Sequence, residues 1–158
     1  MSVYRVDKLM AEARKLAAAY RRETGKALAV SGEIAVSDAV NLLQLEPAAD
    51  DAVGYDAWRE RDGNRENILI KARVIFSEQP RTHRLGQLKL DSDWQILMLV
   101  VLNEEYETDE IWEVGRDVVD AQLAEQAANR RGTLTVARIR HIGELAWARE
   151  DASPGGAG

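Results

Sequence analysis

Apolar residues in the first part of the chain recur at spacings of three and four, which is the period of one helix face. The pattern predicts a first helix over residues 3–22, with an apolar stripe made of Val6, Leu9, Met10, Ala13, Leu16, Ala17 and Tyr20. Ser31 offers an N-cap for a second helix over residues 31–44, which has to stop before Pro47 because proline cannot continue a helix. The chain therefore opens with two helices.

The period then shifts from helical spacing to alternation and to continuous apolar runs, both typical of strands. Four strands are predicted, over residues 55–58, 67–76, 94–102 and 111–114. Asp62 and Gly63 suit the turn of a hairpin between the first two of them. The run WQILMLVVL at 94–102 is apolar throughout, as expected of a central strand covered on both faces.

Helical spacing returns after the strands. It predicts one helix over residues 116–130 and, after a turn at Gly132, a last helix over residues 135–147. Residues 151–158 (DASPGGAG) are small and polar, and we expect this tail to be disordered. The order of elements predicts one α/β domain over residues 1–150, a helix–sheet–helix sandwich. Its four-stranded sheet is expected to be mainly antiparallel or mixed, with an extra N-terminal helix and a C-terminal helical hairpin.

Composition narrows the chemistry. The chain has 158 residues, of which 46% are hydrophobic and 30% are charged, so it can bury the core of one domain. It contains no cysteine, which excludes disulfides, thiolate metal sites and thiol nucleophiles, and its two histidines exclude an all-histidine metal site. Any metal would need carboxylate ligands. No apolar run approaches ~18 residues and no signal peptide is visible, so we expect a cytoplasmic protein without a membrane span.

The distribution of charge bears on possible partners. The formal net charge of −6 is unfavourable for binding nucleic acid. However, residues 59–89 hold eight basic and four acidic side chains (net +4), and residues 127–150 hold five and two (net +3). Between them, residues 90–126 hold one basic and eleven acidic side chains (net −10). Either these are solvated faces of an ordinary acidic protein, or the two basic segments share a side that faces phosphate.

Three charged residues occupy successive elements and are candidates for a site. Glu33 lies in the first turn of the second helix, on or beside the stripe that should face the sheet. Asp56 lies on the first strand, and Lys71 lies on the second with its side chain on the face opposite Ile68 and Ile70. Two carboxylates and an ammonium group from neighbouring elements can meet at one end of a sheet, either as a catalytic site or as an ion pair that joins the helix to the sheet.

The segments around these residues resemble the PD-(D/E)XK, or restriction-endonuclease-like, superfamily and its small uncharacterised bacterial members. The similar segments are SGEIAVSDAV around Glu33, GYDAW around Asp56 and ILIKAR around Lys71, within a similarity over residues 28–130. The resemblance implies a nuclease that cleaves DNA or RNA with Mg²⁺ or Mn²⁺. It implies that Asp56 is the central metal ligand, Glu33 an auxiliary ligand or base, and Lys71 the cation that positions the attacking water and stabilises the transition state.

One position departs from the family pattern. Leu69 stands two residues before Lys71, where the family has an acid or glutamine, and a leucine cannot ligate a metal. Either Glu33 replaces the missing ligand, because Mg²⁺ needs only one or two protein carboxylates, or the chain is a catalytically inactive module that binds protein or nucleic acid, with a homodimer as one form of it.

Further basic residues are weaker candidates for contacts with nucleic acid. They are Arg73, Arg81, Arg84, Arg138 and Arg140. The last two lie on the second of two helices in segment 116–147, which leaves a helix-turn-helix DNA-binding regulator as a third hypothesis. The apolar period of that helix is equally explained by packing against the core.

Overall fold

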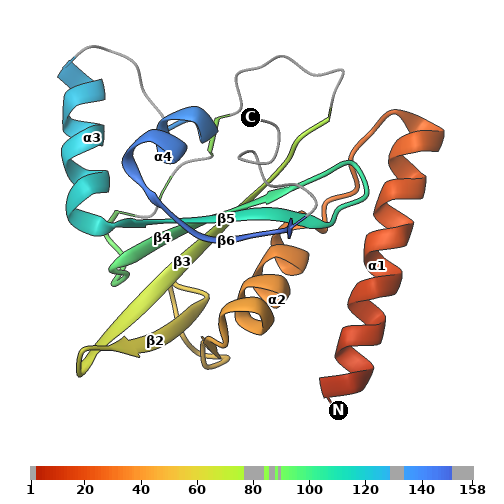
Figure 1. The fold of residues 1–158 in the computed structure, drawn as a ribbon, viewed down its shortest axis with the longest axis horizontal. Coiled ribbons are helices and arrows are strands. Elements are labelled where there is room, and N and C mark those ends of the chain that lie inside the picture. The colour runs from red at the N-terminus through yellow and green to blue at the C-terminus, as the bar shows by residue number, and fades with distance from the viewer. Residues whose placement is uncertain (1–2, 77–83, 86–87, 89, 129–133, 151–158) are drawn as a thin grey trace.

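The computed structural model describes residues 3–76, 84–85, 88, 90–128 and 134–150, and Figure 1 shows a sheet with helices on both of its faces. The helices are α1 (Val3–Thr24), α2 (Ser31–Leu43), α3 (Arg116–Ala128) and α4 (Val136–Ile142). The strands are β1 (Glu46–Pro47), β2 (Ala57–Arg61), β3 (Asn64–Val74), β4 (Ile96–Leu102), β5 (Thr108–Gly115) and β6 (Glu144–Ala148). The predicted α/β class is confirmed, and the sheet is mixed.

The sheet has six strands in the order β1-β2-β3-β4-β5-β6, so each strand lies beside its neighbour in sequence. All neighbours are antiparallel except β3 and β4, which run parallel. A parallel pair needs a crossover connection. The chain makes it between Val74 and Ile96, a segment that lies in part outside the described residues.

Two apolar clusters lie on opposite faces of the sheet. α2, with part of α1, packs over one face, where Ile68, Ile70 and Met98 are buried. Leu69, Leu97 and residues of α3 and α4 form the cluster on the other face. All seven residues of β4 are buried, as the continuous apolar run predicts. The result is a three-layer sandwich whose central strands are covered on both faces (Figure 1).

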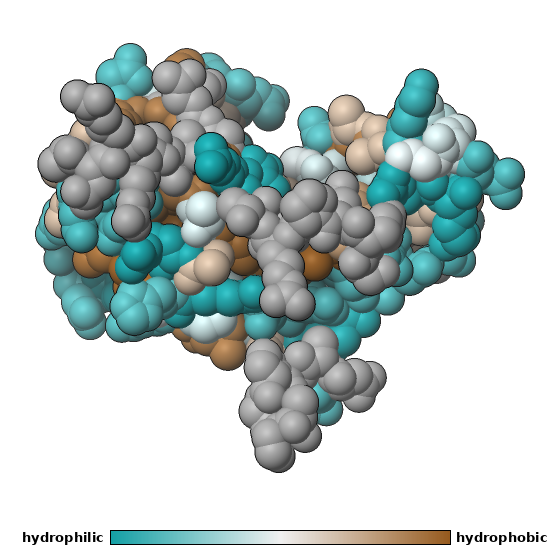
Figure 2. All heavy atoms as spheres, turned by 90° about the horizontal axis from the view of Figure 1, so that it is seen from above, coloured by the Kyte–Doolittle hydropathy of each residue, from teal (hydrophilic) through white to brown (hydrophobic). Residues whose placement is uncertain are grey.

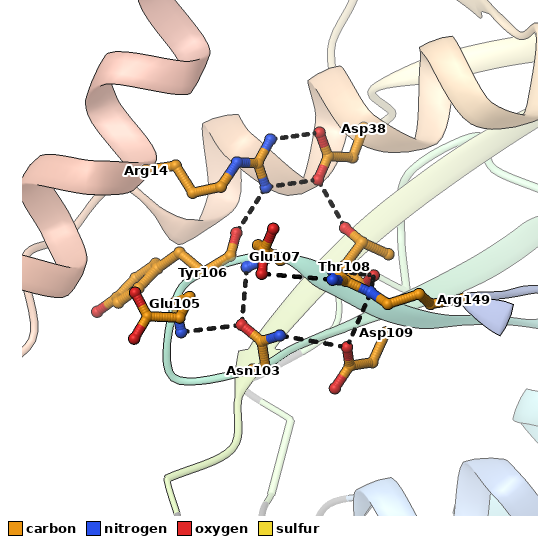
Figure 3. A network of polar contacts seen from close by, with 9 residues as sticks. All are labelled: Arg14, Asp38, Asn103, Glu105, Tyr106, Glu107, Thr108, Asp109 and Arg149. Carbon is orange, nitrogen blue, oxygen red and sulfur yellow. Dashed lines mark hydrogen bonds and ion pairs between the residues drawn. The ribbon is translucent and has the colours of Figure 1, made fainter. Parts of the chain in front are cut away.

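A polar network joins α1 and α2 to the turn between β4 and β5 (Figure 3). Both terminal nitrogens of Arg14 donate to the carboxylate of Asp38 at 2.9 Å, and Arg14 also donates to the carbonyl of Tyr106 at 2.6 Å. The Thr108 hydroxyl donates to Asp38 at 2.6 Å. The hydrogen bond with Asp38 raises the pKa of the Arg14 guanidinium despite its partial burial. The network fixes the position of α1 relative to α2.

The hairpin between β2 and β3 forms where the sequence predicts it. Asp62 and Gly63 both have positive φ, at 55° and 80°, which is the geometry of a two-residue hairpin turn. The strands extend further than predicted, because β3 begins at Asn64 and pairs with β2 as far as the turn. β5 likewise begins at Thr108, three residues before the strand predicted over residues 111–114.

The prediction of a C-terminal helical hairpin is wrong for its second half, and the predicted four-stranded sheet therefore has too few strands. α4 ends at Ile142, and Glu144–Ala148 forms the edge strand β6 on β5. Gly143 makes this change of direction: a Cβ there would lie 2.8 Å from the carbonyl oxygens of Glu113 and Ile139. Leu145, which continues the helical period in the sequence, is 48% exposed. The short strand β1 is a further strand that the sequence analysis missed.

Candidate functional site

The candidate site lies where the pairing of β2 with β3 ends. The last pair is Ala57 with Ile68, whereas β3 continues to Val74. Just before β2, the backbone N–H of Asp56 donates to the Ile68 carbonyl, and its carboxylate accepts the backbone N–H of Ile70, both at 2.8 Å. Backbone N–H groups of a strand point along the plane of the sheet. The Asp56 carboxylate therefore lies at the edge of β3.

The approach of the chain to Asp56 depends on a glycine. Gly54 has a φ of +88°, in the left-handed region that glycine adopts readily. A Cβ at this position would lie 2.3 Å from the side chain of Ser92. Gly54 thus allows the tight passage that brings Asp56 to the edge of β3.

Glu33 and Asp56 line one cavity of about 680 Å³ between α1, α2 and β3. Its walls are largely apolar, and its charged lining residues are Asp7, Glu33 and Asp56. No lysine or arginine of the described chain lines it. Like charges that share a site repel one another, so this cavity favours a cation. The remaining lining residues are Val6, Met10, Gly32, Val36, Ser37, Val40, Asn41, Pro47 and Ile70.

Lys71 follows Ile70 directly but leaves β3 on the opposite face. Ile68 and Ile70 belong to the cluster under α2, whereas Leu69 belongs to the cluster under α3 and α4. Because side chains alternate along a strand, Lys71 lies on the side of Leu69, where it is half-buried. The structure therefore brings Glu33 and Asp56 to one cavity and places Lys71 beside it, across the edge of the strand.

Leu69 is 6% exposed and packs with Leu97 and Leu99. The position where the resemblance expects a third ligand is thus part of the core. Among the residues that the structure describes, no group of three or more histidine, aspartate or glutamate side chains is arranged to hold a metal ion. Glu33 and Asp56 are a pair of carboxylates, and Mg²⁺ accepts one or two such ligands with water and phosphate oxygens completing its shell.

The weaker candidates lie apart from this cavity. The side chain of Arg73 donates to the carbonyls of Arg84 and Ala72, both at 2.6 Å. Arg140 donates to the buried Glu110 at 2.7 Å and so joins α4 to β5. The cap of α4 is formed by Thr135, whose hydroxyl accepts the backbone N–H of Arg138.

Some predictions fall outside the described residues. These are Arg81, the turn at Gly132 and the tail 151–158. The second helix of the predicted helix-turn-helix is short, because α4 has seven residues and Glu144–Ala148 is a strand.

Two residues near the site were missed by the sequence analysis. Asp7 lines the cavity, and its carboxylate accepts a hydrogen bond from Asn41 at 3.2 Å. A signal for Asp7 is its place on α1 between Val6 and Met10, which belong to the apolar stripe. Arg65 lies over the ring of Trp58 on the β2–β3 hairpin, with 4.2 Å between Cζ and the ring centroid. Its only signal is its place in a hairpin near Asp56.

In comparisons with known proteins, no family model and no curated sequence matches this chain. None of the described helices combines the length and the apolar character that a membrane span requires.

Proposed function

We propose that this protein is a divalent-metal-dependent nuclease that hydrolyses phosphodiester bonds of DNA or RNA. The observation that supports this proposal is the shared cavity of Glu33 and Asp56 at the edge of β3, next to Lys71. In this proposal Asp56 and Glu33 hold Mg²⁺ or Mn²⁺. Lys71 supplies the positive charge for the phosphoryl oxygens.

The residues suit these roles for physical reasons. The Ile70 N–H fixes one oxygen of Asp56, which keeps the carboxylate in place before a metal or substrate arrives. Glu33 is exposed in the first turn of α2, so it can complete a site without being drawn out of a core. A bound Mg²⁺ would acidify a water and neutralise charge on the phosphoryl group.

Lys71 approaches the same edge from the other face of the sheet. Its side chain has no hydrogen bond or ion pair with any described residue, so its ammonium group can follow a phosphate. A lysine acts as a flexible point charge and does not need the fixed geometry of an arginine. A phosphodiester that crosses the edge of β3 would thus meet carboxylates on one side and a cation on the other.

The architecture is consistent with a restriction-endonuclease-like fold, which we propose for the helix α2, the mixed sheet and the helix α3. Leu69 occupies the third ligand position of the family pattern. The resemblance therefore agrees with metal binding only if two carboxylates suffice. The proposed mechanism therefore depends on Glu33 more than is usual for the family pattern.

The test is cleavage of plasmid DNA, single-stranded DNA and RNA in Mg²⁺ or Mn²⁺. The wild type should cleave at least one of them, and Asp56→Asn should lower the rate by about 100-fold or more, because the central ligand is lost. Glu12→Gln is the matched control: it removes an exposed carboxylate of α1 that does not line the cavity, so its rate should stay within about 3-fold of the wild type. Activity that survives in Asp56→Asn would contradict the proposed catalytic site.

A second candidate is a catalytically inactive module that acts through binding. This candidate is favoured by the burial of Leu69 in the core, because the residue at the position of the third ligand packs there and cannot bind a metal. This candidate predicts that millimolar Mg²⁺ or Mn²⁺ leaves the melting temperature of the protein unchanged. A metal-induced rise in the melting temperature that Asp56→Asn abolishes would exclude this candidate.

A further inference from the structure

The helix α1 carries apolar side chains on two of its faces. Ala17 and Ala18 are buried in the cluster that lies under α2, so they hold the inner face of α1 on the core. In contrast, Leu9, Leu16 and Tyr20 are 46%, 61% and 38% exposed. Single exposed apolar residues are common on protein surfaces. Several of them on one helix face are instead typical of an interaction surface.

The exposed apolar residues of α1 follow a heptad spacing. The residues Val6, Leu9, Ala13, Leu16 and Tyr20 are separated by three, four, three and four positions. This is the a/d repeat of a helix that pairs with another helix. Each residue advances about 100° around the helix axis, so the five positions fall within about 80° of its surface. We call these five residues the α1 seam.

The helix that carries the α1 seam lies at the periphery of the molecule. Figure 1 shows α1 at one end of the longest axis, with α2 and the sheet on its inner side. In Figure 2, which is turned by 90°, the same end of the molecule projects from the rest. The helix has 22 residues and is therefore about 33 Å long. A second molecule can reach the seam along most of this length.

Charges at the two ends of the seam indicate which partner fits it. Arg5 lies in the first turn of α1 and Glu23 in its last turn, and both are exposed. By helical spacing both stand on the same side of the seam. Two copies of α1 in parallel would bring like charges together at each end. Two antiparallel copies would place Arg5 of each copy beside Glu23 of the other, which is favourable.

The shapes of the seam residues also suit an antiparallel pair. With a two-fold axis midway between residues 14 and 15, Leu16 of each copy lies opposite Ala13 of the other. Leu9 of each copy then lies opposite Tyr20 of the other. A large side chain thus meets a small one near the axis, and an aliphatic side chain meets an aromatic ring further out. Both matches allow close packing of the two helices.

From this arrangement we infer that α1 pairs antiparallel with α1 of a second copy, so that the protein forms a two-fold symmetric dimer. The inference goes beyond the proposed function and does not depend on it. One helix seam buries less than the roughly 800 Å² per partner of a standard interface. We therefore expect a dissociation constant of about 10 μM.

The test is sedimentation velocity of the whole protein in EDTA, over concentrations from about 1 to 200 μM. The wild type should show a reversible equilibrium between monomer and dimer. Leu16→Glu should raise the dissociation constant by more than about 30-fold, because it buries a charge at the centre of the pair. Val118→Glu is the control: it changes an exposed apolar residue of α3, and its dissociation constant should stay within about 2-fold of the wild type.

A charge reversal tests the direction of the two helices. Arg5→Glu and Glu23→Arg should each weaken the dimer by about 5-fold, because each replaces two attractions by two repulsions. The double variant should return to within about 2-fold of the wild type, since the opposite charges meet again. A wild type that stays monomeric, a Leu16→Glu variant that dimerises like the wild type, or a double variant no stronger than the single ones would overturn the inference.

Discussion

The arginines on the two faces of the β2–β3 hairpin have different kinds of partner. On the face toward α2, Arg59 donates to Glu66 at 2.8 Å and to Glu113 at 3.0 Å, and Arg61 donates to Glu113 at 3.1 Å. On the other face, Arg65 has polar and aromatic partners and forms no ion pair with a described residue, although Glu60 is its cross-strand neighbour. In the sequence these arginines belong to one basic segment, residues 59–89. The structure divides them into arginines that are paired with carboxylates and an arginine that is not.

The arginines on the two faces also differ in how burial affects their pKa values. The side chains of Arg59 and Glu113 are 15% and 12% exposed. Burial alone would lower the pKa of Arg59, but Glu113 and Glu66 outweigh it and raise that pKa above its ordinary value. The pKa of Arg73 is instead lowered by burial, with only carbonyl acceptors for its N–H groups. Ion pairs therefore stabilise the first face. On the second face, the Arg73 guanidinium is held by backbone carbonyls.

The largest expected difference between the faces is in stability. Arg59→Met should lower the free energy of unfolding by about 2 kcal/mol or more, because it leaves half-buried carboxylates without their main partner. Arg65→Met should cost about 1 kcal/mol or less, since it loses an exposed contact with Trp58. Urea denaturation of both variants measures this. Equal losses would contradict the distinction between the faces.

A smaller effect is expected in the pH dependence of stability. Burial would raise the pKa of Glu113, but hydrogen bonds from Arg59 and Arg61 hold it below its ordinary value. A carboxylate with a lowered folded-state pKa contributes stability that is complete above its unfolded pKa and is lost as the pH falls toward the folded value. The wild type should thus lose about 1 kcal/mol more than Glu113→Gln between about pH 6 and pH 3.

The control for this comparison is Glu60→Gln, which removes an exposed carboxylate of β2. Its loss on acidification should match that of the wild type. If Glu113→Gln also matches the wild type, the Arg59–Glu113 pair does not stabilise the folded state in the way described.

The smallest expected effect concerns the salt dependence of oligonucleotide binding. Arg73→Gln removes one cation of β3, so the slope of log K against log salt concentration should fall by about 1 if this residue contacts phosphate. Arg61→Gln should leave this slope unchanged, because Glu113 already neutralises that arginine. Fluorescence anisotropy titrations at several salt concentrations give both slopes. A lower slope in Arg61→Gln would mean that both faces contact the oligonucleotide.

The elements were predictable where one physical signal dominated. The apolar run of β4 and the Asp62–Gly63 turn are confirmed, because continuous burial and positive φ leave clear marks on a sequence. β6 was missed because the helical period of α4 continues by chance to Leu145, and the signal that stops the helix is the close approach of Gly143 to Glu113 and Ile139. That approach is a tertiary contact, which the local sequence does not contain.

The candidate site, like the fold, could be predicted only in part. The order of elements led to the expectation that Glu33 and Asp56 lie near one another, and both line one cavity. It could not show that Asp56 is held by the Ile70 N–H at the edge of β3. Nor could it separate Arg65 from Arg59, because their difference depends on Glu113, which lies about fifty positions further along the chain.

The central claim is that Glu33 and Asp56 together hold a divalent cation, and calorimetric titration of Mn²⁺ into the whole protein tests it most directly. The account predicts one saturable binding site in the wild type and in Glu12→Gln, and no binding heat in Asp56→Asn or in Glu33→Gln. Absence of heat in the wild type, or binding that persists in Asp56→Asn, would contradict it.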